Sequence, residues 1–208
     1  MAIKAILFNA EMVRAILEGR KSCTRKIVKP QQLIGMLPDK CKNGAPEKFL
    51  KEKKLMFKPY CDMTDIELIN TAYKAPYQLG DILYVRETWK KALNGYYYYE
   101  DWQRNDIADV TKWKPSTRMP KEAARIWLKV TDVRVERLQE VSAESALAEG
   151  ANKYIHTNGG LDENMTITSF IGIWNSTIKK SDLDSYGWSA NPWVWVIEFE
   201  RCEKPEGV

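Results

Sequence analysis

A run of cations directly after a short apolar segment contains residue types that nucleophilic catalysis uses. The segment "LEGRKSCTRKIVKP" places Lys21 three residues before Thr24. A threonine hydroxyl is a weak nucleophile that needs an adjacent base, and a lysine amine is a base only when it is neutral. Nearby cations disfavour the charged form of Lys21, and the closest in sequence are Arg20, Arg25 and Lys26. Three interpretations stay open: a solvated basic loop, a strip that grips phosphate, or a nucleophile with its base.

A carboxylate that could assist this pair is Glu149, in the last turn of a predicted helix, "AESALAE". Ser142 can cap the start of that helix, and Gly150 ends it. The helix dipole disfavours a negative charge in the last turn by about 0.3–1 kcal/mol. Glu149 is therefore a candidate acid or base. The alternative is an exposed glutamate whose charge is screened by salt.

Candidates for the wall of a pocket lie in "YVRETW" and "WKPSTRMP". Strand alternation places Glu87 on an otherwise apolar face, where a carboxylate must be paired or adjoin a cavity. It either lines a site or forms a structural pair at the end of the strand. Trp89, beside Arg86, and Trp113 offer flat faces on which bases stack, at about 1–3 kcal/mol per contact. Most other aromatic residues are expected in the core.

The charge of the chain is unevenly distributed. Residues 1–60 carry 14 Lys and Arg against 5 Asp and Glu, a net +9, and the remainder carries 18 against 23, a net −5, which together give +4. Such asymmetry indicates a polyanion partner at one end. Lysines that only keep a loop soluble would give the same numbers.

Composition excludes several classes of protein. With 208 residues and 44% hydrophobic residues, the chain suits one globular domain. No apolar run approaches the roughly 18 residues of a membrane span, and the N-terminus does not read as a signal peptide, so a cytoplasmic location is expected. The four cysteines form no CxxC pair and there is one histidine, so no metal site and no cofactor are predicted. Glycine-rich phosphate loops and GxSxG are absent.

The apolar pattern predicts a strand over residues 3–8, a helix over 10–18 and a second strand from residue 82. A hairpin signal follows at Asn94-Gly95. The remaining expected elements are a strand pair or one bent strand over 125–138, the helix after Ser142, a helix over 167–178 and a central strand after Pro192.

This order of elements favours an α+β fold, with a mixed or antiparallel sheet closed into a small β-barrel and flanked by helices. We expect a single domain over residues 1–208. It would carry insertions at 30–75, which is rich in lysine and proline, and at 151–165.

Four segments together resemble the ASCH domain of the PUA-like superfamily: "ILEGRKSCTRK", "GDILYVRETW", "IWLKVTDVRVERLQEVSAESALAEGA" and "WVWVIEF". The phrases "YVRETW", "KPSTRMPKEAAR" and "NPWVWVIEFER" are similar to the longer members found in phages and prophages. The resemblance implies a small β-barrel with a cleft for RNA or a modified nucleoside.

Small bacterial members of that family are amidohydrolases of N4-acetylcytidine that work with a lysine, a threonine and a glutamate. Their pattern falls on Arg20, Lys21, Thr24 and Glu149 of this sequence. Arg20, Arg25 and Lys26 are expected on the substrate side of the site, with Arg25 and Lys26 as electrostatic support. A non-catalytic RNA-binding module and a ribonuclease are the alternatives. Neither the natural substrate nor the oligomeric state follows from the sequence.

Overall fold

The computed structural model describes residues 1–29, 65–103 and 112–207 of the chain. The main sheet has five strands in the order β1-β3-β6-β7-β2. Its strands are β1 (Ile3–Leu7), β2 (Cys23–Ile27), β3 (Ile82–Arg86), β6 (Trp127–Arg137) and β7 (Trp193–Cys202). β1 lies parallel to β3, and all other neighbours in this sheet are antiparallel.

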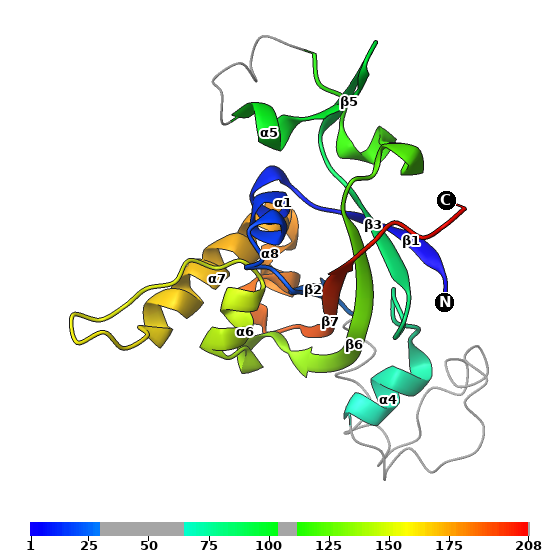
Figure 1. Cartoon of the computed structure of the whole chain (residues 1–208). Coiled ribbons are helices and arrows are strands. Elements are labelled where there is room, and N and C mark those ends of the chain that lie inside the picture. Colours follow the sequence, from blue (N-terminus) through cyan, green and yellow to red (C-terminus); the bar gives the residue numbers. More distant parts are fainter. Residues whose placement is uncertain (30–64, 104–111, 208) are drawn as a thin grey trace.

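In the described residues, a separate hairpin and six α-helices lie on one side and at the ends of the sheet (Figure 1). The hairpin consists of β4 (Trp89–Ala92) and β5 (Gly95–Tyr98). The helices of the described residues are α1 (Ala10–Leu17), α4 (Asp65–Ala72), α5 (Tyr99–Gln103), α6 (Ala143–Ala148), α7 (Glu163–Thr177) and α8 (Leu183–Tyr186). Helices α1, α6 and α7 gather on one side of the sheet, and the hairpin with α5 extends from one end of it.

The predicted starts and ends of α1 and α6 are confirmed. The side chain of Asn9 accepts a hydrogen bond from the backbone of Met12 and so caps α1, which ends before Gly19 with a φ of 74°. Ser142 caps α6 in the same way, and Gly150 follows that helix with a φ of 96°. Only glycine adopts such positive φ values without strain. The chain therefore leaves both helices sharply, close to Lys21 and Glu149.

The predicted bent strand is also confirmed, as the single long strand β6. Its pairing with β7 shifts register between Val130 and Asp132, and such a bulge bends a strand and increases its twist. β7 is buried on both faces, as predicted. Trp195 and Ile197 face a core shared with β1, β3 and α1, whereas Val196 faces the core beneath α6 and α7.

The closed barrel expected from the sequence is not confirmed. In the described part of the chain the sheet has β1 and β2 as its two edges, and no pairing joins them. Of the expected insertions, residues 30–64 lie outside the described residues, and α4 follows them. Residues 151–165 contain a loop with a bridge between Ile155 and Leu161, and then the start of α7.

Candidate active site

Lys21 and Glu149 meet where the ends of α1 and α6 adjoin the start of β2. The backbone N–H of Lys21 donates to the carbonyl of Ala15 (3.0 Å), and that of Ser22 donates to the carbonyl of Ala148 (2.8 Å). A Cβ atom on Gly150 would lie 3.2 Å from the Cβ of Ala15. The two helix ends are thus packed closely, and they bring Lys21 beside Glu149.

The amine of Lys21 is buried and held by backbone carbonyls. Its Nζ donates to the carbonyl oxygens of Cys23 (2.7 Å) and Glu149 (2.9 Å), and it lies 5.4 Å from the ring centroid of Phe8. Burial lowers the pKa of Lys21, and the nearby carboxylate of Glu149 opposes that shift. In the neutral amine, two N–H bonds satisfy the two carbonyls and leave the lone pair to accept a proton.

The carboxylate of Glu149 is shared between two cations. One oxygen accepts a hydrogen bond from Nη1 of Arg25 (2.9 Å), and the other lies 3.7 Å from Nζ of Lys21. Arg25 also donates from Nη2 to the hydroxyl of Ser145 (2.8 Å) and to the carboxylate of Glu136 (3.2 Å). Arg25 is itself held by Ser145 of α6 and Glu136 of β6. It therefore fixes the orientation of the Glu149 carboxylate.

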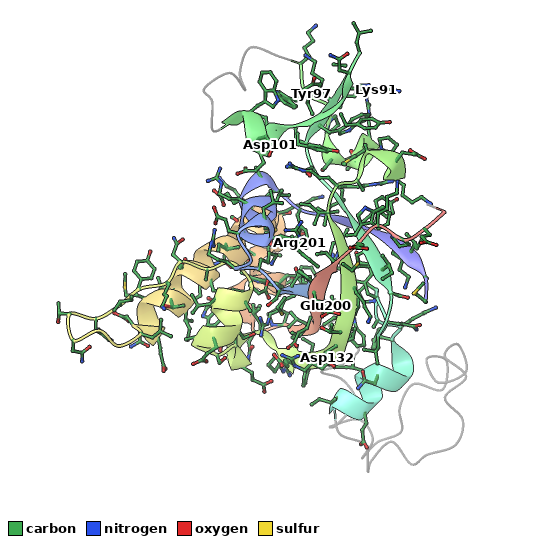
Figure 2. All side chains as sticks on the ribbon, viewed as in Figure 1. Lys91, Tyr97, Asp101, Asp132, Glu200 and Arg201 are labelled. Atoms are coloured by element: carbon green, nitrogen blue, oxygen red, sulfur yellow. The ribbon has the colours of Figure 1, made fainter. Side chains whose placement is uncertain are left out.

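This ion network continues to the surface of β6. Arg134 donates to the carboxylates of Glu136 (2.6 Å) and Asp132 (2.8 Å), and also to that of Glu198 on β7. Asp132 lies toward the α4 end of the sheet in Figure 2. Exposed pairs of this kind contribute little to stability, but a network of them restricts the position of Glu136 and, through it, that of Arg25.

Thr24 is buried near this network but lies outside it. Its register partner on β7 is Ile197, and opposite residues of an antiparallel pair share a face. Thr24 therefore faces the core that contains Ile197 and Phe8, the side on which Nζ of Lys21 lies over Phe8. Among the described residues, no side-chain hydrogen bond of Thr24 is found. Lys21 is linked to it through the carbonyl of Cys23, which belongs to the peptide bond preceding Thr24.

A cavity of about 380 Å³ reaches Glu149 from the side of α1 and α7. Its wall is mostly polar and includes Asn9, Arg20, Asn152, Ser169 and Ser176. Lys21 and Thr24 are not among its lining residues. Of the three predicted catalytic residues, Glu149 is thus the one that lines this cavity.

The other cations of the strip occupy three different environments. Arg20 is half exposed, lines the cavity and pairs with Glu18 (2.7 Å). Arg25 is buried in the ion network, so it does not present its guanidinium to solvent. Lys26 lies on the opposite face of β2, where burial lowers its pKa and its Nζ lies 5.2 Å from the ring centroid of Tyr77. The structure therefore divides the strip between the two faces of β2.

The sequence left two alternatives for Glu87, a place in a site or a structural pair at the end of its strand, and the structure shows the pair. Both oxygens of Glu87 accept hydrogen bonds from Arg125 at 2.9 Å, directly after β3. Trp89 is buried in the core beneath the hairpin, rather than at a pocket wall. Arg86 donates to the hydroxyl of Tyr84 and the carbonyl of Thr117. These residues lie apart from Lys21 and Glu149.

Trp113 differs from the other predicted wall residues because it does line a pocket. It encloses a cavity of about 250 Å³ together with Tyr97 and Trp102. This cavity belongs to the hairpin and α5, not to the ion network around Glu149.

Two partners in the network were missed by the sequence analysis. Ser145 precedes Glu149 by four residues, so the two share a helix face, and this spacing was a usable signal. Glu136 is a charged residue on a long, partly buried strand, which signals a need for a partner. The partner itself, Arg25, lies 111 residues away and no local pattern identifies it.

The structure gives no basis for a metal centre or a membrane span in its described residues. No cluster of three or more His, Cys, Asp or Glu side chains suited to a metal ion occurs in residues 1–29, 65–103 and 112–207. In the same ranges no helix has the length and apolar character needed to cross a bilayer.

Comparison with known proteins adds little to these contacts. No family model and no curated protein matches the chain. Among solved structures, the ASCH domain from Lactobacillus crispatus JV V101 aligns with 96% of this chain and 79% of its own, at a TM-score of 0.41 and 11% identity. A likeness of this degree assigns neither membership of a family nor a residue role, so function rests on the contacts above.

Proposed function

We propose that this chain recognises an acylated nucleobase and hydrolyses its exocyclic amide, with N4-acylated cytidine as the substrate class. The supporting observation is the environment of Lys21, a buried lysine whose two carbonyl contacts are satisfied by a neutral amine and whose pKa burial lowers. A lysine whose neutral form is favoured by burial can act as a general base.

In the first step, the lone pair of Lys21 takes the proton of the Thr24 hydroxyl, and the threonine oxygen attacks the amide carbonyl. The tetrahedral intermediate collapses as the bond from carbon to the exocyclic nitrogen breaks. The ammonium of Lys21 returns the proton to that nitrogen, so that cytidine leaves and the acyl group remains on Thr24 as an ester.

In the second step, a water molecule gives a proton to Lys21 and attacks the ester. The bond to the threonine oxygen breaks, Lys21 returns the proton to that oxygen, and the carboxylic acid is released. The overall change is one amide and one water converted to one amine and one acid, with Lys21 and Thr24 restored.

Glu149 stabilises the ammonium that forms on Lys21 in each step. Its carboxylate is 3.7 Å from Nζ, and Arg25 holds it there at 2.9 Å. The same carboxylate lines the cavity of about 380 Å³, from which a nucleoside would approach.

The direct test is incubation of purified protein with N4-acetylcytidine, with cytidine and acetate measured by chromatography. Lys21→Met keeps an unbranched apolar side chain in the buried site and removes the amine, so it should abolish turnover. Circular dichroism of the variant shows whether it is folded. Absence of turnover by folded wild-type protein would reject this substrate.

A second function, RNA binding without hydrolysis, is favoured by a groove on the other face of β2. Lys26, Lys29, Lys74, Tyr73 and Trp195 line this cavity of about 380 Å³. Three phosphate contacts from its lysines would make the affinity for single-stranded RNA fall with salt, with a logarithmic slope of about −2. A ribonuclease is less well supported, because Lys21 and Arg25 are both engaged by protein groups rather than turned to a phosphate.

Two variants, one on each face of β2, distinguish hydrolysis from RNA binding. Lys26→Gln with Lys74→Gln should weaken RNA binding and leave turnover of the free nucleoside unchanged. Lys21→Met should do the opposite. An effect of both changes on both readouts would mean that the two faces of β2 form one site.

A further inference from the structure

The β4–β5 hairpin has two faces with different surroundings. The register pairs Trp89 with Tyr98 and Lys91 with Tyr96. Trp89, Tyr96 and Tyr98 pack against a core that includes Trp127, so this face attaches the hairpin to the sheet. The unit formed by the hairpin and α5 extends from the end of the sheet above α1 (Figure 1).

The opposite face of the hairpin forms a pocket walled by aromatic rings. The register pairs Lys90 with Tyr97, and these two residues enclose a cavity of about 250 Å³ with Ala92, Trp102 and Trp113. The rings of Tyr97, Trp102 and Trp113 are half-buried, so each keeps part of its surface exposed.

The rings hold one another in place by edge contacts. Trp102 lies 6.0 Å from Tyr97 and 6.3 Å from Trp113, and Trp113 lies 5.5 Å from Tyr99 at right angles to it. Contacts of this geometry are favourable between aromatic rings. The pocket is thereby preorganised, which reduces the entropy that a bound ligand would cost.

Two lysines lie at this pocket. Lys90 lines it, and Lys112, next to Trp113, is exposed. The acidic residues of α5 are engaged by arginines of the body: Glu100 by Arg14 and Asp101 by Arg125. Tyr97, Lys91 and Asp101 are labelled on this unit in Figure 2. The pocket is therefore suited to a flat group that carries, or is attached to, negative charge.

We infer that this pocket binds an unpaired base of a single-stranded nucleic acid, with Lys90 beside the adjoining phosphate. Aromatic side chains bind bases by stacking in single strands, where a cationic groove follows the backbone. A duplex does not offer its bases in this way. The ligand class rests on the proposed function, whereas the site is separate from Lys21 and Glu149.

A proline-rich peptide is the competing occupant, because such peptides also dock on aromatic grooves. The lysines decide between the two: a peptide of proline and small residues has no charge for them to meet, whereas each nucleotide supplies a phosphate. The peptide therefore serves as a second arm of the test.

The experiment measures the fluorescence anisotropy of a labelled oligouridine of about twelve nucleotides, within the 4–16 that one binding module covers. Trp113→Ala should weaken binding about 5- to 150-fold, the loss that one stacking contact implies. Lys90→Gln should reduce the salt slope by about one. Tyr154→Ala removes an exposed aromatic side chain from a loop outside this unit and is the matched control, with no change expected. Neither Trp113→Ala nor Lys90→Gln should change the affinity of the protein for a duplex of the same length.

Three results would overturn the inference: no binding of the oligonucleotide by wild-type protein, unchanged affinity in both pocket variants, or binding of a proline-rich peptide instead. Lys90→Gln changes a half-buried surface side chain, so it separates loss of contact from loss of folding if Trp113→Ala is unstable. Turnover of free N4-acetylcytidine by Lys90→Gln should stay at the wild-type rate. Loss of binding alone thus leaves the proposed hydrolysis standing, and loss of turnover alone leaves the pocket standing.

Discussion

The side-chain nitrogen of Lys21 lies 3.7 Å from a carboxylate oxygen of Glu149, although 128 residues separate the two in the sequence. The other oxygen of that carboxylate accepts a hydrogen bond from Arg25, at 2.9 Å. Because Arg25 is a permanent cation, it can balance the charge of Glu149 without a proton on Lys21. A neutral Lys21 would therefore leave no unbalanced charge on Glu149, as the proposed mechanism requires.

Replacing Arg25 should change the pH at which the site works. Burial is the largest cause of the lowered pKa of Lys21, and the charge of Arg25 lowers it further, so Arg25→Gln should raise that pKa. Since the base must be neutral, the acid limb of the profile of kcat/KM against pH should move to higher pH. Arg25→Lys retains the charge and should leave the limb closer to that of the wild type. An unmoved limb in folded Arg25→Gln would show that Lys21 is not the titrating base.

Lys21 should also make stability depend on pH. Its pKa in the folded state is lowered from 10.5 by burial, so between the two pKa values the unfolded chain binds the extra proton, and stability rises with pH. Urea unfolding of Lys21→Met should lack this rise. The informative quantity is the difference in the free energy of unfolding between Lys21→Met and wild type as pH increases toward 10.5. Other groups, such as Tyr77 with its pKa raised to about 12, titrate in both proteins and cancel in this difference. A constant difference across that range would contradict a lowered pKa.

The close approach of α1 and α6 predicts different costs for two glycine replacements. Gly19 and Gly150 both have positive φ, so alanine should cost about 1–2 kcal/mol of strain at either position. A Cβ at Gly150 would also lie 3.2 Å from that of Ala15, whereas one at Gly19 meets nothing within 4 Å. Chemical denaturation should therefore show Gly150→Ala to be the less stable variant. Equal losses would mean that the helix ends adjust without cost.

Arg125 should matter for stability more than other surface arginines. Arg125→Ala leaves the buried carboxylate of Glu87 without its two hydrogen bonds, and breaking such a pair costs about 3–5 kcal/mol. Burial already raises the pKa of Glu87, and without Arg125 it should rise further. The loss should then shrink as pH falls and Glu87 is protonated.

Urea unfolding at neutral and acid pH measures both effects. The exposed Arg118 provides the matched control, since Arg118→Ala should change stability little at either pH. A loss in Arg125→Ala that stays the same at acid pH would mean that Glu87 is not the group left unpaired.

Local sequence was sufficient where the backbone itself decides the structure. Asn9, Ser142 and the glycines after α1 and α6 act within one helical turn, so the helix ends that position Lys21 and Glu149 could be predicted. For residues 125–138 the pattern left a strand pair and one bent strand open, and the structure has the bent strand β6. The two alternatives for Glu87 could not be separated, because its partner lies 38 residues away and pairing depends on the folded sheet.

Non-local contacts account for what the sequence could not provide. Arg25 belongs to a basic strip and was expected at the substrate, but alternation along β2 turns it to the α6 face, where Glu149, Ser145 and Glu136 meet it. Thr24 faces the other way for the same reason. Lys21, Thr24 and Glu149 were proposed from local residue chemistry and matched by the resemblance. The contacts join Lys21 to Glu149, while Thr24 lies on the adjoining strand.

Thr24 therefore provides the most direct test of the proposed mechanism. Steady-state hydrolysis of N4-acetylcytidine should be compared in wild-type protein, Thr24→Ser and Thr24→Val, because valine keeps the shape of threonine without its hydroxyl. We predict that Thr24→Val lowers kcat on the order of 10⁴-fold or more, as removal of a nucleophile does, while Thr24→Ser retains measurable turnover. A folded Thr24→Val variant with wild-type kcat would contradict the mechanism and remove Thr24 from the site.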